Sequence, residues 1–503
     1  MLPNFSRFLM SSAVSLLWSK RAVCVACSAL IAGCAIGPDY QRPELDVGVN
    51  FKNEATQAAQ ASDNPGWLLA QPADAQIGVV KWWAAFNDPL LSELMEKMLA
   101  HNASLEQSEA RYRQALAALG SARAEFYPTL NSSGSYTRSG SGSSTPSASD
   151  SYSMSLTAGW EPDIWGKVRR SNEAAEASLQ ASQADIAATQ LSLASTLAQS
   201  YFQAKNVWVS QQLLDQTIAA YERVLQITQN RYEAGMSSRS DVASAQAQLE
   251  NARTQRLSLN RQQGQLHNAM AVLLGVTPAA MQTLTLEGWP TLPSMPAAVP
   301  VQLLERRPDV ASAERQMMAA NAKIGVAQAA WLPDLTLSAQ GGYRASEWSD
   351  WFTAPARFWS LGPALALQIF DGGARSARVD DARAAYDAQA ASYRQTILDA
   401  IKEVEDGLVQ WQGLSAEMQT QQRALDAARE SLTLMRNQYA AGMVDFLSLA
   451  QVETSTLSTE RSTISMQADH YIAAVQLIAA LGGGWDATSL NQPPVLQQSP
   501  VQD

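Results

Sequence analysis

The chain has 503 residues, more than one hydrophobic core usually organises, so several domains or one repetitive architecture are expected. Apolar residues make up 46% of the sequence and charged residues 17%, a balance that excludes disorder for most of the chain. The formal net charge is −11 and no run is rich in Lys and Arg, which excludes a basic surface for nucleic acid.

The N-terminus has the pattern of a secretory signal. Lys20 and Arg21 precede an apolar stretch over residues 22–33, which is too short to span a bilayer as a helix. The stretch ends in Leu30-Ile31-Ala32-Gly33-Cys34, which resembles the lipobox of bacterial lipoproteins. This resemblance implies that residues 1–33 are a signal peptide and that Cys34 carries the lipid. An ordinary signal with an accidental cysteine is the alternative.

No residue pattern points to catalysis. The three cysteines all lie within the first 34 residues, and the three histidines are scattered along the chain. A Cys- or His-ligated metal is therefore not expected. The sequence also lacks a Gly-x-Ser-x-Gly motif, a P-loop and a dinucleotide fingerprint. We expect no enzyme activity, no cofactor and no metal site.

The hydrophobic period changes along the first half of the chain. Residues 34–100 are expected to form an extended segment and a first short helix. A helix over 102–126 is expected before Pro128. From Tyr152 to Trp160, apolar residues alternate with small or polar ones, the pattern of a strand with one apolar face; a weaker strand is expected over 129–138. Each strand is long enough to cross a bilayer when tilted.

A very long helix is predicted next. Residues 167–234 contain no Gly and no Pro, so they can form one helix of about 100 Å. Apolar or small residues follow steps of four and three along it, the spacing of a supercoiled helix, at Leu214, Ile218, Tyr221, Leu225, Thr228 and Tyr232. After Gly235 a shorter helix is expected over 236–274.

The same order of elements is expected twice, because the sequence contains a duplication. The segment Asn230-Arg231-Tyr232-Glu233-Ala234-Gly235-Met236 returns as Asn437-Gln438-Tyr439-Ala440-Ala441-Gly442-Met443. The interpretation is a first repeat over 101–275, a Pro-rich linker over 276–307, a second repeat over 308–484 and a flexible tail over 485–503. The second repeat should contain helices over 309–331, 374–441 and 443–481, and strands over 335–340 and 361–369.

Lengths indicate how these elements pack. The helix after each tip glycine is about 40 Å shorter than the long helix, and the helix before each strand pair has nearly that length. Two short helices stacked end to end would therefore line one long helix. Four strands cannot close a barrel, and open edges are not tolerated in lipid, so several chains must share one. A dimer of eight strands and a trimer of twelve are both possible, and only the trimer leaves an open lumen.

These features resemble the outer-membrane efflux lipoproteins of the TolC family, of the OprM/NodT type. The resemblance is carried by Cys34 to Pro43, Trp82-Trp83, Asp88-Pro89-Leu90, Arg306 to Val310, both Tyr-x-x-Gly tips and Leu481 to Trp485. It implies a mainly α fold with a transmembrane β part. A long antiparallel α-helical periplasmic tunnel would join four β-strands per chain, which form a 12-stranded barrel in a homotrimer in the outer membrane.

The resemblance also implies the function. Such a chain would export small molecules, such as drugs and toxic compounds, as a passive conduit. Its partners would be a periplasmic adaptor (membrane fusion) protein, an inner-membrane RND-type transporter and outer-membrane lipid, with no nucleic acid. Two alternatives are the outer-membrane component of a type I protein secretion system and a periplasmic coiled-coil scaffold lipoprotein. The scaffold would leave the four strands without a role.

The same resemblance implies that the tips form the periplasmic aperture. Gly235 and Gly442 mark the adaptor-contact tips, and the candidate gate residues are Tyr232, Ser240, Asp241, Tyr439, Asp445, Ser448 and Gln451. Relatives often carry acidic residues at the positions of Ser448 and Gln451, which puts an acidic ring in doubt here. Simpler roles are also open: heptad packing for the tyrosines, a capping box with Ser238 for Asp241, and an N-cap for Asp445.

Overall fold

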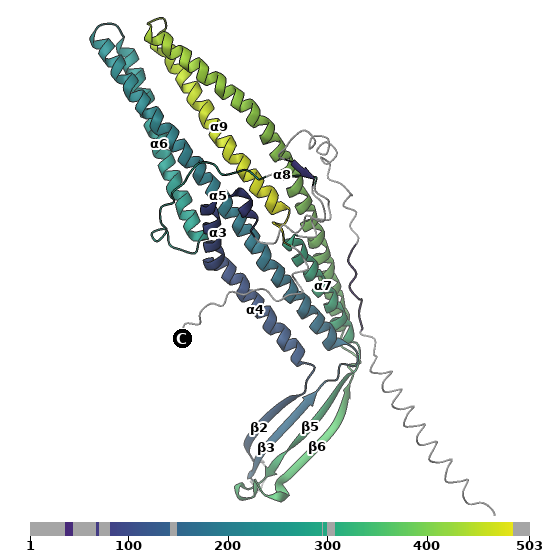
Figure 1. The fold of residues 1–503 in the computed structure, drawn as a ribbon. Helices are drawn as coiled ribbons and strands as arrows, with labels where there is room; N and C mark the ends of the chain where they lie inside the picture. Colours follow the sequence, from purple (N-terminus) through teal and green to yellow (C-terminus); the bar gives the residue numbers. More distant parts are fainter. Residues whose placement is uncertain are drawn as a thin grey trace, which may run out of the picture. The chain divides into compact units, whose positions relative to one another are not determined.

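The computed structural model describes residues 36–43, 67–69, 81–140, 148–293, 295–298 and 307–485 (Figure 1). The predicted signal peptide, Cys34 and residues 486–503 lie outside the described residues. The chain divides into two compact units. We call residues 1–44, 112–182 and 313–393 the strand unit, and residues 45–111, 183–312 and 394–503 the hairpin unit. Each unit contains segments of both predicted repeats.

The strand unit contains one antiparallel sheet of four strands in the order β2-β3-β5-β6 (Figure 1). The first repeat contributes β2, Thr129–Gly140, and β3, Ala148–Trp160. The second repeat contributes β5, Asp334–Ala345, and β6, Arg357–Ala366. The central pair, β3 and β5, joins the two repeats in one ladder. Strands β2 and β6 are therefore the two edges of the sheet.

The last strand differs from its prediction. We expected it over 361–369, but β6 begins at Arg357 and ends at Ala366, so Leu367 and Ile369 follow the strand. Its final residue, Ala366, pairs with Asp334, the first residue of β5. The residue before Asp334 is Pro333, which has no N–H group for the ladder. Pairing therefore stops at this point, and the alternation of Leu367 and Ile369 has no partner strand.

Two long helices dominate the helical part of the chain. They are α5, Lys167–Glu233, and α8, Ala374–Ala440; each has 67 residues, about 100 Å, and ends one residue before its predicted end. After each tip comes a helix of 35 residues, α6 over Arg239–Leu273 and α9 over Phe446–Ala480. Both begin three residues later than predicted, because capping residues occupy the turn before them. Within the described ranges, no helix combines the length and apolar character needed to cross a membrane.

Shorter elements complete the two units. The helices before the strands are α4, Ala103–Ala124, and α7, Pro308–Ala329. The 3-10 helix η2, Trp82–Phe86, and α3, Pro89–His101, precede α4. Two short strands, β1 over Trp67–Leu69 and β4 over Met295–Ala298, pair in parallel. This small sheet was not predicted, because segments of three and four residues are too short to show an alternating pattern.

Short helices meet end to end at equivalent positions of the two repeats. In the first, the side-chain amide of Asn102 donates to the Leu273 carbonyl at the end of α6, at 2.8 Å. In the second, the Arg307 guanidinium donates to the Ala480 carbonyl at the end of α9, at 3.0 Å. Both bonds satisfy a carbonyl that the helix itself leaves without a partner. The sequence offsets of 205 and 207 residues show that the duplication extends to these junctions.

The first of these junctions explains why residue 275 is a glycine. Gly275 has a φ of +70°, and a Cβ there would lie 1.9 Å from the His101 carbonyl oxygen. We expect Gly275→Ala to lower the free energy of unfolding by about 2–4 kcal/mol, from backbone strain plus the clash. The matched control is Gly235→Ala, where φ is +71° but nothing lies within 4 Å. It should cost about 1–2 kcal/mol in the same urea titration, and equal costs would contradict the clash.

The core of the hairpin unit contains a row of aromatic rings. Phe86 packs against Phe202 with ring centroids 5.2 Å apart, and Phe202 stacks on Tyr471 at 5.0 Å. Trp289 also stacks on Tyr471, with ring centroids 5.0 Å apart. Phe86 and Phe202 are fully buried. The row joins η2, α5, α9 and the segment after α6.

A buried ion pair lies beside these rings. Asp88 caps α3 and accepts from the Leu90 and Leu91 N–H groups through Oδ1. Its Oδ2 accepts from the Tyr201 hydroxyl at 2.6 Å and from the Lys205 ammonium at 2.9 Å. Lys205 also donates to the Gly288 carbonyl at 2.9 Å. All polar groups of this cluster therefore have partners, as a buried charged cluster requires.

Candidate functional site

The two faces of the sheet differ in chemistry. One row of paired residues crosses all four strands through Leu130, Ala158, Ala339 and Leu361. The next row, on the opposite face, crosses them through Asn131, Thr157, Gln340 and Ser360. The alternation predicted from the sequence thus produces one apolar and one polar face.

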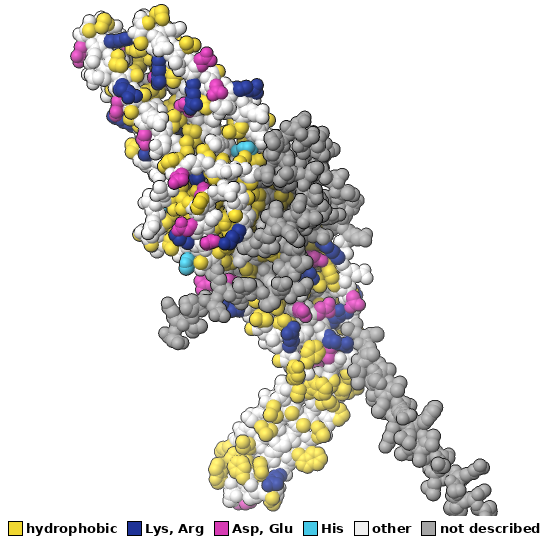
Figure 2. All heavy atoms as spheres, in the orientation of Figure 1, with side chains coloured by type: hydrophobic (Ala, Val, Ile, Leu, Met, Phe, Trp, Pro, Cys, Tyr) yellow, Lys and Arg dark blue, Asp and Glu magenta, His cyan; other side chains and the backbone are white. Residues whose placement is uncertain are grey.

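Side chains on the apolar face are exposed, whereas side chains on the polar face hydrogen-bond to one another. Leu130 is 70% exposed and Leu361 is 76% exposed. On the polar face, the hydroxyls of Ser133 and Ser155 lie 3.1 Å apart, and those of Ser135 and Ser153 lie 2.8 Å apart. In Figure 2, hydrophobic side chains cover much of the visible face of the sheet, whereas charged side chains gather over the helices. This arrangement suits a sheet with lipid on one side and water on the other.

Both tips use the same backbone device. At the first, Gly235 donates to the Tyr232 carbonyl and Met236 to the Arg231 carbonyl. At the second, Gly442 donates to the Tyr439 carbonyl and Met443 to the Gln438 carbonyl. This is the Schellman pattern, which needs a left-handed residue after the helix. Gly235 and Gly442 supply it with φ values of +71° and +73°.

Asp241 belongs to a capping box at the start of α6. Its Oδ2 accepts from the Ser238 backbone N–H at 2.9 Å and from the Ser237 hydroxyl at 2.8 Å. The Ser238 hydroxyl accepts from the Asp241 N–H at 3.1 Å. Donation from the Ser238 N–H, followed by that from the Ser237 hydroxyl, lowers the pKa of Asp241. Its contacts in the structure are thus those of a capping box, one of the two roles that the sequence left open for Asp241.

Asp445 is the N-cap of α9. Its Oδ1 accepts from the Ser448 N–H at 2.8 Å, and contact with Ser448 lowers the pKa of Asp445. The negative charge of Asp241 acts in the opposite direction, so the two capping carboxylates are close enough to influence each other. Two further candidates, Ser240 and Gln451, are exposed, and Ser448 is half-buried.

The two candidate tyrosines lie in different surroundings. Tyr232 is 44% exposed. Tyr439 is half-buried and packs against the cluster of Ala245, Phe446 and Ala450. The Arg231 guanidinium of α5 lies over the Tyr439 ring, 4.7 Å from its centroid, which makes a cation–π contact between the two tips.

Arg231 is not among the residues that the sequence pattern singles out. The available signal was the difference between the repeats, because Gln438 occupies the equivalent position of the second tip. Only a view of both tips together shows that the arginine of one reaches the tyrosine of the other.

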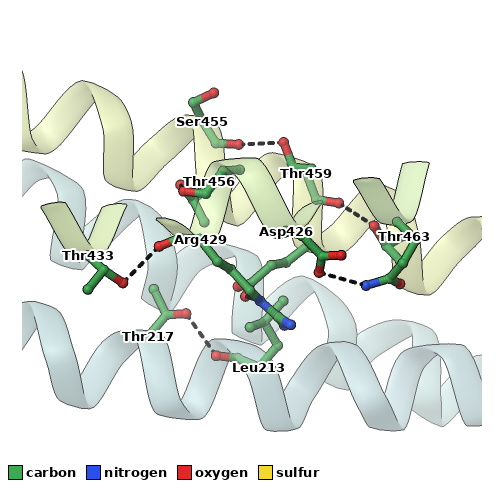
Figure 3. A network of polar contacts seen from close by, with 12 residues as sticks. Leu213, Thr217, Asp426, Arg429, Thr433, Ser455, Thr456, Thr459 and Thr463 are labelled. Carbon is green, nitrogen blue, oxygen red and sulfur yellow. Dashed lines mark hydrogen bonds and ion pairs between the residues drawn. The ribbon is translucent and has the colours of Figure 1, made fainter. Parts of the chain in front are cut away.

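Polar bonds join the short helices of the two repeats. The Gln248 amide of α6 donates to the Ala450 carbonyl of α9 at 3.2 Å, and Arg461 of α9 donates to the Gln255 side chain of α6 at 2.8 Å. Many hydroxyls on the long helices α5 and α8 and on α9 instead bond to the carbonyl four residues earlier. Figure 3 shows this for Thr217, Thr433, Thr459 and Thr463. Such bonds let Ser- and Thr-rich helices pack closely without unpaired hydroxyls.

The described residues include no group of three or more His, Cys, Asp or Glu side chains arranged to hold a metal ion.

Comparison with known proteins places the chain in a family. The sequence model described as "Outer membrane efflux protein" matches residues 94–276 and 299–483. The cation efflux system protein CusC of Escherichia coli O6:H1 is 29% identical over 467 residues, covering 92% of this chain and 98% of CusC. The probable efflux pump outer membrane protein TtgC of Pseudomonas putida is 29% identical over 469 residues, covering 91% of this chain and 94% of TtgC.

Similarity to solved structures supports the same family. The outer-membrane channel OprN superposes with a TM-score of 0.81 at 28% identity, over 90% of this chain and 100% of OprN. The open state of the MtrE outer membrane channel of Neisseria gonorrhoeae gives a TM-score of 0.78 at 28% identity, over 90% of this chain and 98% of MtrE. The chain therefore has the TolC-like fold and belongs to the family of outer membrane efflux proteins, the channels of efflux pumps in the outer membrane.

Proposed function

We propose that three copies of this chain form one passive conduit across the outer membrane. The observation that carries the proposal is the four-stranded sheet, whose apolar face is exposed and whose edge strands β2 and β6 pair only on their inner sides among the described residues. Unpaired strand edges are not stable in lipid. If β6 of each copy pairs with β2 of the next, three copies give a closed barrel of twelve strands with an open lumen.

The proposed partners follow from the family. We infer a periplasmic adaptor that contacts the tips around Gly235 and Gly442, and an inner-membrane RND-type transporter that supplies the exported compound. The relatives include a cation efflux protein and an efflux pump protein, each 29% identical to this chain. We therefore propose small solutes as the exported class. No reaction is assigned to the chain, since members of the family are channel proteins.

Cross-linking and bilayer recording test the conduit. The detergent-purified full chain should give cross-linked species that stop at three protomers, and it should open discrete conductance steps in planar bilayers. A stable monomer without conductance would overturn the proposal.

Lipid attachment at Cys34 is a separate proposal, supported by the lipobox and by the relative SilC of Salmonella typhimurium, described as a probable outer membrane lipoprotein. Cys34→Ser should abolish incorporation of radiolabelled palmitate. The matched controls are Cys24→Ser and Cys27→Ser, which should label as the wild type does. Undiminished labelling of Cys34→Ser would contradict the assignment.

The tip residues should separate into capping and gating roles. We expect Tyr439→Ala to raise single-channel conductance, because it removes the ring beneath Arg231, whereas Tyr439→Phe keeps that ring and should leave conductance unchanged. Asp241→Ala should leave conductance unchanged and cost about 0.5–2 kcal/mol of helix stability, as the loss of a cap does. A rise in conductance with Asp241→Ala would instead assign Asp241 to the gate.

A further inference from the structure

A buried acidic residue, Glu453, lies near the tips of the hairpin unit. It is on α9 and only 3% exposed. Ala450 lies three residues earlier on the same side of the helix and packs against Ala245 of α6. A carboxylate at such a position is unusual, because a buried charge is costly unless it is fully paired.

The carboxylate of Glu453 is only half paired. Its Oε1 accepts from Nε and Nη2 of Arg436 on α8, at 3.1 and 3.0 Å. Its Oε2 is buried and has no hydrogen-bond partner in the structure. Arg436 itself is half exposed, with 49% of its side chain accessible. The ion pair therefore has one end in the interior and the other in water.

The charges around Glu453 leave Arg436 as its partner. On α5 the facing group is Tyr221, whose pKa is raised to about 12 by burial and by the charge of Glu453. Nearby charged residues pair elsewhere, Glu222 of α5 and Glu250 of α6 with Arg253, and Arg429 of α8 with Glu460 of α9. Burial raises the pKa of Glu453 above its usual value of 4.5, although Arg436 opposes this.

We propose that Glu453 is a proton-binding site that strengthens the packing of α5, α8 and α9 when it is protonated, so that acidification favours the arrangement of the tips seen here. The proton binds at Oε2, where no partner competes for it. The neutral carboxyl no longer carries an incompletely solvated charge, and the half-exposed Arg436 can turn to water at small cost.

The direction of the pH effect follows from the linkage between proton binding and packing. A carboxyl whose pKa is higher in the packed state than in a loosened, hydrated state binds its proton more tightly in the packed state. Acidification therefore stabilises the packed state, and this gain is lost as the pH rises through the raised pKa. For a difference of one pKa unit, the ratio of packed to loosened states changes by up to about tenfold.

The tip contact lies one helical turn away. Tyr439 is three residues from Arg436 on α8, so both lie on one side of the helix. Tyr439 packs against Phe446 of α9 and lies beneath Arg231 of α5. Tighter packing at Glu453 should therefore hold Tyr439 in place and lower conductance, a step that rests on the proposed conduit.

The experiment uses the full-length trimer in two assays, planar-bilayer conductance and thermal melting, at pH 7.5 and pH 5. We expect the wild type to conduct less and melt higher at pH 5 than at pH 7.5. Glu453→Gln, which mimics the protonated form, should conduct at the low level and melt at the high temperature at both pH values. Arg436→Gln should melt lower than wild type at pH 7.5 and recover most of that deficit at pH 5.

The matched control is Glu460→Gln. Glu460 pairs with Arg429 across the same two helices at 2.8 Å, with 57% of the arginine side chain exposed. This variant should keep the pH response of the wild type. A wild-type pH response in Glu453→Gln, or a lower melting temperature of this variant at pH 7.5, would overturn the proton site. If no variant conducts at any pH, the conduit fails, while the melting data still decide on Glu453.

Discussion

Lys205→Ala is expected to lower the free energy of unfolding by about 3–5 kcal/mol. The Lys205 side chain is 3% exposed and that of Asp88 is 7% exposed, so removal of the ammonium leaves a carboxylate charge buried with fewer donors. The Tyr201 hydroxyl alone cannot replace the lost charge. Urea titration of the full-length protein, followed by tryptophan fluorescence, measures the effect through the shift of the unfolding midpoint.

The control for this variant is an exposed ion pair of the same type. Lys97 and Glu93 of α3 lie 2.6 Å apart, with more than half of each side chain exposed. Lys97→Ala should cost less than about 1 kcal/mol, because water replaces the lost partner. Equal costs for Lys97→Ala and Lys205→Ala would show that burial does not make the Asp88 pair special.

The buried pair of Asp88 and Lys205 also makes the stability of the protein depend on pH. Burial raises the pKa of Asp88, but hydrogen bonds from Tyr201 and Lys205 outweigh it and hold the pKa below its usual value of 3.8. A carboxyl whose pKa is depressed in the folded state stabilises the fold fully above its unfolded pKa. That contribution is lost as the pH falls through the folded pKa. The stabilities of the wild type and Lys205→Ala should therefore converge below about pH 4 and differ most near neutrality.

Features with a local cause could be predicted from the sequence. The long helices end within one residue of their predicted ends, because Gly235 and Gly442 adopt the left-handed conformation just after them. The capping box of Asp241 follows from the Ser-x-x-Asp spacing. The alternation in β3 was also visible, since each strand carries its own two-residue period.

Features that depend on distant residues could not be predicted. Asp88 and Lys205 are 117 residues apart, and no local pattern connects them. The end of β6 depends on Pro333, which lies before the partner strand rather than in β6. Glu453 occupies an ordinary position of a polar helix in the sequence, and only its contact with Arg436 and the unpartnered Oε2 show that it is unusual. Burial of charge was thus the property that the sequence did not reveal.

Leu156→Arg is expected to prevent assembly of the membrane part, with a cost of about 2–4 kcal/mol per chain if Leu156 lies near the middle of the bilayer. Leu156 is 53% exposed on the apolar face of β3, and it pairs with Ser132 on one side and Gly341 on the other. Neither neighbour can neutralise an arginine. Because each of three copies would carry the change, the costs add, and heat-resistant trimer should disappear from outer-membrane fractions.

The next residue of the same strand provides the control. Thr157 lies on the opposite face and pairs with Asn131 and Gln340, so an arginine there would meet polar groups and water. Thr157→Arg should therefore assemble like the wild type and change ion selectivity towards anions, because a ring of positive charge would line the lumen. If both variants lose the trimer equally, the two faces do not separate lipid from water. If only Thr157→Arg fails, the faces are reversed and the apolar row from Leu130 to Leu361 faces the interior of the barrel.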